Sequence, residues 1–316
     1  EHAYAVDGNV WFAVTSDADY GRLSGRKLDE QSAGTRDTES AGKRHPADFA
    51  LWKAAKPGEP SWDSPWGKGR PGWHIECSAM ATKYLGETFD IHGGGDDLKF
   101  PHHENELAQS ECCTGKPFAR FWLHNGLTRM KTKAAGDEYN KISGSVLTLA
   151  GNETLLASVS VDNLLSTHGP ELLRYLLLST HYRRPIDFSD DVIIAMKKGL
   201  SSFHRMFDRM TRLNVPLADE QADIDVAAQT LLDGPNGDFV KLILDLKMRW
   251  LEMMDDDFNT AGALASMHEM LSAINACVDQ AQLEKSPDAT AMNAVTAAVS
   301  TLLGGNASAS LSTKGS

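Results

Sequence analysis

The chain has 316 residues, 41% hydrophobic and 23% charged, a composition typical of a globular protein with room for two domains. Its net charge of -12 at pH 7 argues against non-specific nucleic-acid binding, which needs a broad basic surface. No apolar run approaches a membrane span and the first residues do not resemble a signal peptide, so no membrane partner is expected. The four cysteines lack the density of a secreted disulfide scaffold, which favours a cytoplasmic location.

In the first part of the chain, residues 8–15 are rich in β-branched and aromatic types and predict a strand. Residues 28–45 are polar and predict an exposed loop or hairpin arm. Residues 48–70 carry three tryptophans among prolines and glycines, and we expect coil there, around a pocket rim. A helix is predicted over 75–85, with Gly86 as its stop.

The next segment has the pattern of an α/β enzyme. A strand is predicted over 89–92, and it ends in a glycine cluster, Gly93–Gly95. A helix over 102–113 and a strand over 120–124 follow, and then a loop through Lys141 to Asn152. A strand that leads into glycines and a helix is typical of nucleotide sites, although three adjacent glycines are more often a plain turn.

After about residue 185 the apolar residues recur with the period of a helix. Thr260 is a candidate cap for the third of the helices expected here. Residues 304–316 are rich in small residues and are expected to be disordered. The fold class is therefore α/β followed by an all-α helical bundle, whose helices are predicted over 190–211, 236–254, 258–280 and 288–303.

Cys77, His102 and Glu106 are candidate metal ligands. If Pro101 opens a helix, His102 and Glu106 stand at i and i+4 and lie on one face. A thiol, an imidazole and a carboxylate suit Zn²⁺, and three ligands leave a position open for a substrate. The plain alternatives are a chance His–Glu pair and a buried Cys that serves as a small hydrophobe.

Several stretches together resemble the cysteinyl-tRNA synthetases, and they run in family order from the first residues to about 265. They are residues 19–26, 69–80, 89–106, 174–183 and 254–260. The resemblance implies a class I synthetase with a Rossmann-like catalytic domain. Residues 1–188 would form the C-terminal part of that domain and residues 189–303 a helical domain that contacts tRNA, with 304–316 as a tail.

The resemblance also implies that Cys77, His102 and Glu106 hold one zinc ion, which binds the thiolate of the substrate cysteine. A pocket that recognises shape alone discriminates poorly between cysteine and serine, whereas zinc favours a thiolate. By the same resemblance Trp73 packs on the bound cysteine and His92 lies beside that pocket. Ordinary core packing is the alternative for Trp73.

Gly94, Gly95 and Asp97 match the family segment that receives the adenosine of ATP, and the carboxylate of Asp97 suits ribose hydroxyls. A helix cap is the plain alternative for Asp97. ATP is the expected substrate, with Mg²⁺. His103 and Glu104 are expected to support the site or the fold.

The chain departs from the family in three places. The strand with a fourth zinc ligand and the His-Ile-Gly-His element of the family are missing at the front, so the sheet is expected to lack its first strands. In the loop that matches Lys-Met-Ser-Lys-Ser, Lys141 is the candidate catalytic and ATP-binding residue, but Gly144 replaces the second lysine. An error in the gene model is the plain alternative for Gly144. No anticodon-reading module follows the bundle.

The leading hypothesis is a monomeric cysteine–tRNA ligase that activates cysteine with ATP and passes it to tRNA(Cys), with little or no activity expected of this chain alone. A second hypothesis is a ligase that transfers cysteine to an amino sugar in mycothiol synthesis. The missing anticodon module favours it, whereas residues 19–26 and 254–260 count against it. A third is a degenerate, non-catalytic paralogue. A hydrolytic zinc enzyme is weaker, because the chain has no His-Glu-x-x-His motif.

Overall fold

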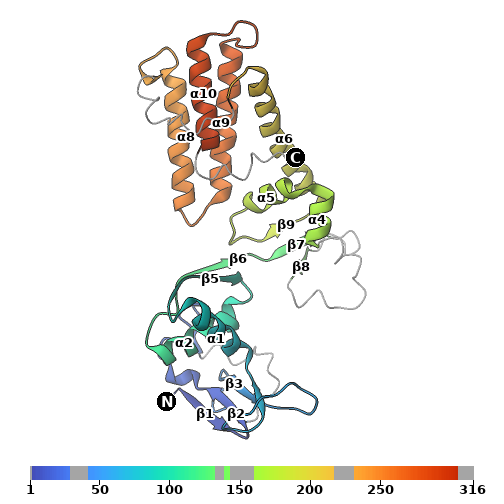
Figure 1. The fold of residues 1–316 in the computed structure, drawn as a ribbon, viewed down its shortest axis with the longest axis vertical. Helices are drawn as coiled ribbons and strands as arrows, with labels where there is room; N and C mark the ends of the chain where they lie inside the picture. Colours follow the sequence, from blue (N-terminus) through green and yellow to red (C-terminus); the bar gives the residue numbers. More distant parts are fainter. Residues whose placement is uncertain (1, 29–41, 132–138, 143–159, 217–230, 305–316) are drawn as a thin grey trace. The chain divides into compact units, whose positions relative to one another are not determined.

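The computed structural model describes residues 2–28, 42–131, 139–142, 160–216 and 231–304, which Figure 1 draws in colour. The chain separates into two compact units, an N-terminal unit (residues 1–127) and a C-terminal unit (residues 128–316). Among the described residues, no helix has both the length and the apolar character needed to cross a membrane. Gly144, most of the predicted arm at 28–45 and all but the first residue of the predicted tail lie outside these residues.

The N-terminal unit begins with a four-stranded antiparallel sheet in the order β1-β2-β3-β4. The prediction of coil over 48–70 is wrong at both ends, because β3 and β4 pair there, with Trp52 opposite Pro71. The Pro/Gly-rich part lies in the connection between these two strands. The predicted strand over 8–15 ends earlier, at Phe12, and a short 3-10 turn, Val14–Ser16, follows it. The strands are β1 Ala3–Val6, β2 Asn9–Phe12, β3 Phe49–Ala54 and β4 Gly69–Pro71.

A buried carboxylate, Asp48, joins the parts of this sheet. It is 1% exposed and accepts hydrogen bonds from the Tyr4 hydroxyl at 2.6 Å and from the backbone N–H groups of Val14 and His45, both at 3.0 Å. Burial, with the bond to Asp48, raises the pKa of Tyr4 to about 12. Asp48 therefore ties β1 to the segments on either side of the polar arm.

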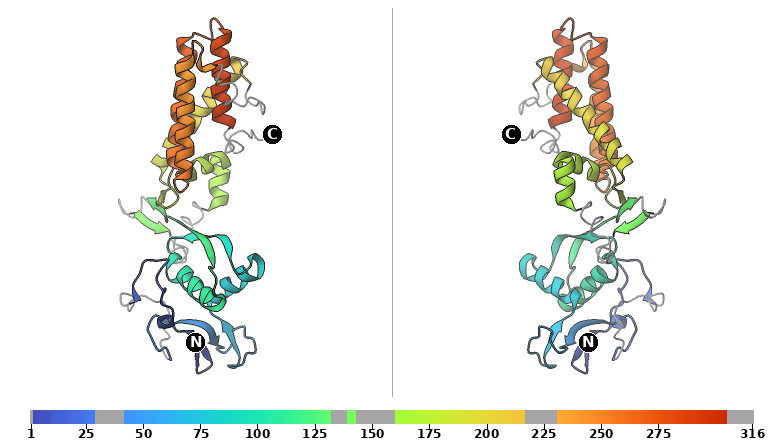
Figure 2. Two further views of the ribbon diagram at one scale, coloured as in Figure 1. Left: turned by 90° about the vertical axis from the view of Figure 1, so that its left-hand side faces the viewer. Right: turned by 90° about the vertical axis from the view of Figure 1, so that its right-hand side faces the viewer.

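The second sheet of this unit is a parallel pair, β5 (Phe89–Gly95) and β6 (Ala119–Asn125). The predicted strand over 89–92 is too short, because Gly93, Gly94 and Gly95 continue β5 and pair with Leu123, His124 and Asn125. Backbone pairing needs no side chain, so glycine does not end a strand that has a neighbour. Helices α1 (Trp73–Leu85) and α2 (Glu104–Thr114) lie beside this pair (Figure 2), and Leu107 packs with Phe89 and Phe118.

Helix α2 is buried over its whole first part, although its residues are mostly polar. Glu104 is 1% exposed and accepts hydrogen bonds from the backbone N–H groups of Gly21 at 3.0 Å, Leu23 at 3.3 Å and Ser24 at 2.7 Å. Asn105 accepts a bond from the Tyr20 hydroxyl at 2.6 Å. The turn near residue 21 and helix α2 therefore hold each other in place.

The C-terminal unit combines a small sheet, in the order β8-β7-β9, with helices. The segment predicted as a loop up to Asn152 contains an antiparallel hairpin of β7 and β8. The helices α4 and α5 were not predicted from the sequence. The four predicted bundle helices are present within two residues of their predicted bounds. The elements are β7 Thr128–Lys131, β8 Tyr139–Ile142, α4 Val161–His168, α5 Pro170–Leu178, β9 Ile186–Asp187, α6 Asp190–Arg212, α8 Gly237–Asp255, α9 Thr260–Gln280 and α10 Ala289–Gly304.

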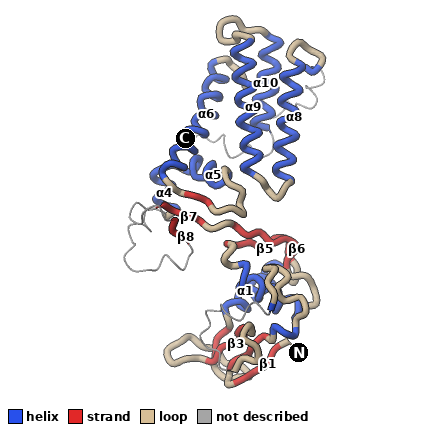
Figure 3. Tube along the Cα trace, turned by 180° about the vertical axis from the view of Figure 1, so that it is seen from behind, coloured by secondary structure: helices blue, strands red, loops and turns tan. Residues whose placement is uncertain are grey.

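The bundle helices run side by side, as Figure 3 shows. Their apolar side chains form a shared core that includes Phe203, Met206 and Ile274. The cap of α9 is Asn259, not Thr260, because the Asn259 side chain accepts a bond from the backbone N–H of Gly262 at 3.0 Å. An amide oxygen one residue earlier reaches this donor, and Thr260 becomes the first helical residue.

Two of the stretches that carried the family resemblance meet in this unit. Asp257, in the turn between α8 and α9, accepts hydrogen bonds from two nitrogens of Arg183 and, at 2.8 Å, from the Tyr182 hydroxyl. Asp257 and Phe258 both have positive φ, +52° and +55°, a conformation that costs free energy for residues other than glycine. The contacts with Arg183 hold this turn to the segment that follows α5.

Candidate functional site

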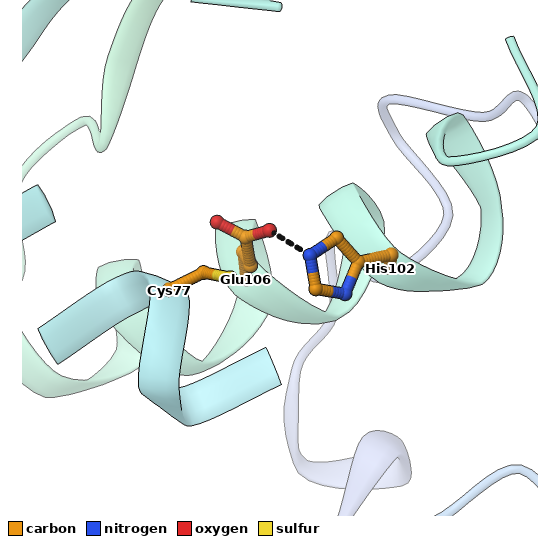
Figure 4. Close-up of side chains that lie close together, drawn as sticks. All are labelled: Cys77, His102 and Glu106. Atoms are coloured by element: carbon orange, nitrogen blue, oxygen red, sulfur yellow. Dashed lines mark ion pairs between the residues drawn. The ribbon is translucent and has the colours of Figure 1, made fainter. Parts of the chain in front are cut away.

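The three predicted metal ligands meet in the N-terminal unit. Cys77 comes from α1, His102 from a single π-helical turn, Lys99–His103, and Glu106 from the first turn of α2. One ligand atom of each lies within 4.8 Å of the others, and Figure 4 shows the three side chains pointing toward one another. The helix expected from 102 starts at residue 104, yet His102 still lies on the same side as Glu106.

The surroundings of the Glu106 carboxylate are those that a bound cation would satisfy. It is 1% exposed, with Nε2 of His102 at 2.7 Å from Oε1 and Nε2 of His92 at 3.5 Å from Oε2. Among the described residues, neither oxygen accepts a hydrogen bond with proper geometry. A buried carboxylate without donors is costly, and a shared cation would remove that cost.

A cation would also stabilise the thiolate form of Cys77. Burial raises its pKa, and the nearby carboxylates of Glu106 and Glu76 raise it further. The thiol therefore stays protonated until a cation stabilises the thiolate, which is how a cysteine becomes a metal ligand. The set of one sulfur, one nitrogen and one oxygen donor fits Zn²⁺.

Two neighbours complete the surroundings of His102. The Trp73 ring stacks on its imidazole, with ring centres 4.1 Å apart and planes 26° apart, and is 58% exposed. Ordinary core packing, the alternative for Trp73, does not hold, since more than half of this side chain is exposed. Nδ1 of His74 lies 2.8 Å from Nδ1 of His102. The sequence reading did not single out His74, although its place in the first turn of α1, beside Trp73, was a usable signal.

His92 borders the same group from β5. His92, His103 and Glu106 form a second set whose ligand atoms lie within 4.8 Å of one another. Nδ1 of His103 is 2.9 Å from Nε2 of His124, and burial, with the neighbouring histidines, lowers the pKa of His103 to about 3. Burial also lowers the pKa of His92. Both imidazoles are therefore neutral near pH 7.

The segment predicted to bind ATP, which contains Gly94, Gly95 and Asp97, lies at the end of β5, just after His92. A Cβ on Gly94 would lie 2.9 Å from Cε1 of the buried His103, so close packing favours glycine there. A Cβ on Gly95 would meet the carboxylate of Asp97, an exposed side chain that can move away. Asp97 is exposed just after β5, and its side chain caps no helix. Lys141 lies in β8 opposite Arg129, in the C-terminal unit rather than in the unit that contains the candidate metal ligands.

Comparison with known proteins identifies the class first. A family model described as tRNA synthetases class I (C) catalytic domain matches residues 1–198, and the DALR domain matches residues 249–304. A crystal structure described as an arginyl-tRNA synthetase from Campylobacter jejuni has the same fold, with a TM-score of 0.50 and 14% identity over 96% of this chain and 57% of that one.

Similar curated proteins indicate which family within this class the chain belongs to. A cysteine–tRNA ligase of Geobacter sulfurreducens is 44% identical over 293 residues, covering 93% of this chain and 55% of the relative. One of Heliobacterium modesticaldum is 48% identical over 278 residues, covering 87% and 52%. This chain therefore belongs to the class I tRNA synthetases and, within them, to the cysteine–tRNA ligase family. It spans about half the length of these relatives.

The family resemblance and the fold class predicted from sequence are thereby confirmed.

Proposed function

We propose that the chain takes part in the ATP-dependent activation of cysteine and its transfer to tRNA(Cys). The observation that carries this is the convergence of Cys77, His102 and Glu106 within 4.8 Å, with a buried carboxylate that accepts no hydrogen bond from the part of the chain that the structure describes. The relatives named cysteine–tRNA ligase and the DALR match support the acceptor. We further propose that 1–188 forms the catalytic part and 189–303 the tRNA-contacting part, in a monomer with one zinc ion.

Cys77, His102 and Glu106 would hold the zinc ion. When bound, zinc offers an open position that favours a thiolate over a hydroxyl, which is the difference between cysteine and serine. Trp73, exposed beside His102, would pack on the substrate side chain, and His92, neutral and next to Glu106, would border the pocket. Binding therefore selects the side chain before any bond changes.

The reaction itself depends on placement and charge. The cysteine carboxylate attacks the α-phosphorus of ATP and pyrophosphate leaves, and a hydroxyl of the terminal ribose of tRNA then attacks the adenylate carbonyl and AMP leaves. Asp97 would bind the ribose hydroxyls of ATP, next to Gly94 and Gly95, with Mg²⁺ on the phosphates. Lys141 would supply positive charge, and because Gly144 supplies none, we propose that catalysis by this chain is weak.

The test measures zinc content and the binding of cysteine and serine by calorimetry, with Glu106→Gln as the variant. Glu106→Gln is expected to lose zinc and the preference for cysteine, whereas Glu87→Gln, an exposed carboxylate paired with Lys116, should keep both. Equal binding of serine and cysteine by the zinc-loaded chain would sink the proposal. Acceptance of cysteine by an amino sugar but not by tRNA would move the chain to that class of ligases.

A further inference from the structure

The imidazoles of His74 and His102 face each other through the same type of atom. Their Nδ1 atoms lie 2.8 Å apart, so one nitrogen carries the proton and the other accepts it. His102 points its second nitrogen, Nε2, at the carboxylate of Glu106, 2.7 Å away. His102 therefore contacts His74 of α1 through Nδ1 and the candidate metal ligand Glu106 through Nε2.

The protonation of His102 follows from its two neighbours. A neutral imidazole has one proton, and a nitrogen that binds a metal has none. If Nε2 faces the cation, the proton is on Nδ1, and His74 must then accept it with the lone pair of its own Nδ1. Ligand histidines generally need such an acceptor on the other ring nitrogen.

We propose that His74 is a positioning residue, which fixes the tautomer and the ring orientation of His102 for zinc. This inference rests on the proposed zinc site at Cys77, His102 and Glu106. The stacked ring of Trp73 restrains the plane of the imidazole, but an apolar face cannot decide which nitrogen carries the proton. On the Nδ1 side of the ring, the hydrogen bond that His102 donates to His74 distinguishes the two tautomers.

The fold holds His74 firmly enough for this role. Its ring meets Phe49 of β3 edge-on, with centres 5.5 Å apart and planes at 88°. The start of α1 is fixed by a bond from the backbone N–H of Gly72 to the carbonyl of Leu51 at 2.9 Å, and a Cβ on Gly72 would collide with the backbone of Ala50. The antiparallel sheet therefore sets the place of His74, and His74 sets that of His102.

Two variants separate the acceptor from the ring. His74→Phe keeps an aromatic ring against Phe49 and removes the acceptor, whereas His74→Asn places an amide oxygen where Nδ1 was and keeps it. Zinc affinity of the full chain is measured by competition with a colorimetric chelator. His74→Phe is expected to weaken zinc binding about 10- to 100-fold, and His74→Asn to restore most of it. His2→Phe, which removes an exposed imidazole next to Ser16, is the control.

The tautomer is read independently from ¹⁵N shifts of the ring nitrogens in the zinc-loaded chain. We expect His102 protonated at Nδ1 in the wild type and in His74→Asn. Unchanged zinc affinity and an unchanged tautomer in a folded His74→Phe chain overturn the inference while leaving the zinc site intact. A wild-type chain that takes up no zinc contradicts the proposed site itself, and this inference with it.

Discussion

Two carboxylates two positions apart in one helix have opposite surroundings. Glu104 and Glu106 are each 1% exposed, but Glu104 accepts three backbone N–H bonds and Glu106 accepts none among the described residues. Burial of a charge is tolerated when hydrogen bonds or a metal replace water. The contrast supports a structural role for Glu104 and is consistent with the cation-binding role proposed for Glu106.

Glu104→Gln should therefore destabilise the N-terminal unit by about 2 to 3 kcal/mol, because an amide N–H₂ would face backbone N–H donors. Urea unfolding followed by tryptophan fluorescence measures this. Glu87→Gln is the matched control, since the Glu87–Lys116 pair is exposed and contributes less than about 1 kcal/mol. Similar losses in the two variants would show that the bonds to Glu104 carry no special weight.

Residues that form a local pattern could be predicted from the sequence, whereas contacts between distant segments could not. Cys77, His102 and Glu106 could be proposed from their residue types and the i,i+4 spacing. The partners of Glu104 could not, because they lie about 80 residues earlier in the chain. The position of His74 beside Trp73 could have marked it as a candidate, but its contact with His102 depends on how α1 packs against the π-helical turn, which no local pattern contains.

Among the helices and strands, the long elements were easier to predict from the sequence than the short ones. The long bundle helices have several turns of apolar spacing, so their period is clear, and α6 and α9 were placed within two residues. The strands β1, β7 and β8 have four residues each, too few for alternation to be distinguished from loop. Strand β2 is equally short but was predicted from its β-branched and aromatic residues. Short strands are specified by their partners in the sheet, which a local pattern does not contain.

The contacts of His268, where α5, α6 and α9 meet, predict how the stability of the C-terminal unit depends on pH. Nε2 of His268 lies 2.5 Å from the Tyr175 hydroxyl, its ring packs against Phe203, and burial lowers the pKa of His268. The unfolded chain, with a histidine pKa of about 6.5, therefore takes up a proton at a higher pH than the folded chain. The stability that His268 contributes is fully present above about pH 7 and is lost as the pH falls below about 6.5 toward the lower pKa of the folded chain.

The variant His268→Gln should show a smaller loss of stability than the wild type between pH 7.5 and 5.5. Thermal unfolding of both chains, followed by far-UV circular dichroism, measures the difference, in which all other titrating groups cancel. Identical pH dependence would mean that His268 is protonated equally easily in the folded and unfolded chain.

For the whole molecule, the family boundary and the compact units do not coincide. The catalytic family model covers residues 1–198, whereas the compact units divide at 127/128. The candidate metal ligands therefore belong to the N-terminal unit and Lys141 to the C-terminal unit. The order of α/β segment and helical bundle was evident from sequence, but the division between units depends on contacts that no local pattern contains.

This division predicts that zinc stabilises one unit and not the other. A ligand that binds only the folded state, at 100 times its dissociation constant, adds about 2.7 kcal/mol. Fluorescence reports the N-terminal unit, because six of the seven tryptophans lie there: Trp11, Trp52, Trp62, Trp66, Trp73 and Trp122. Circular dichroism reports mainly the helices of the C-terminal unit.

We expect zinc to move the fluorescence transition in urea to higher concentration and to leave the main dichroism transition in place, and a chelator to reverse the shift. The reason is that Cys77, His102 and Glu106 all lie within residues 1–127. A shift of both transitions by the same amount would mean that the units unfold as one cooperative body, so that zinc bound in the first unit also stabilises the helical bundle.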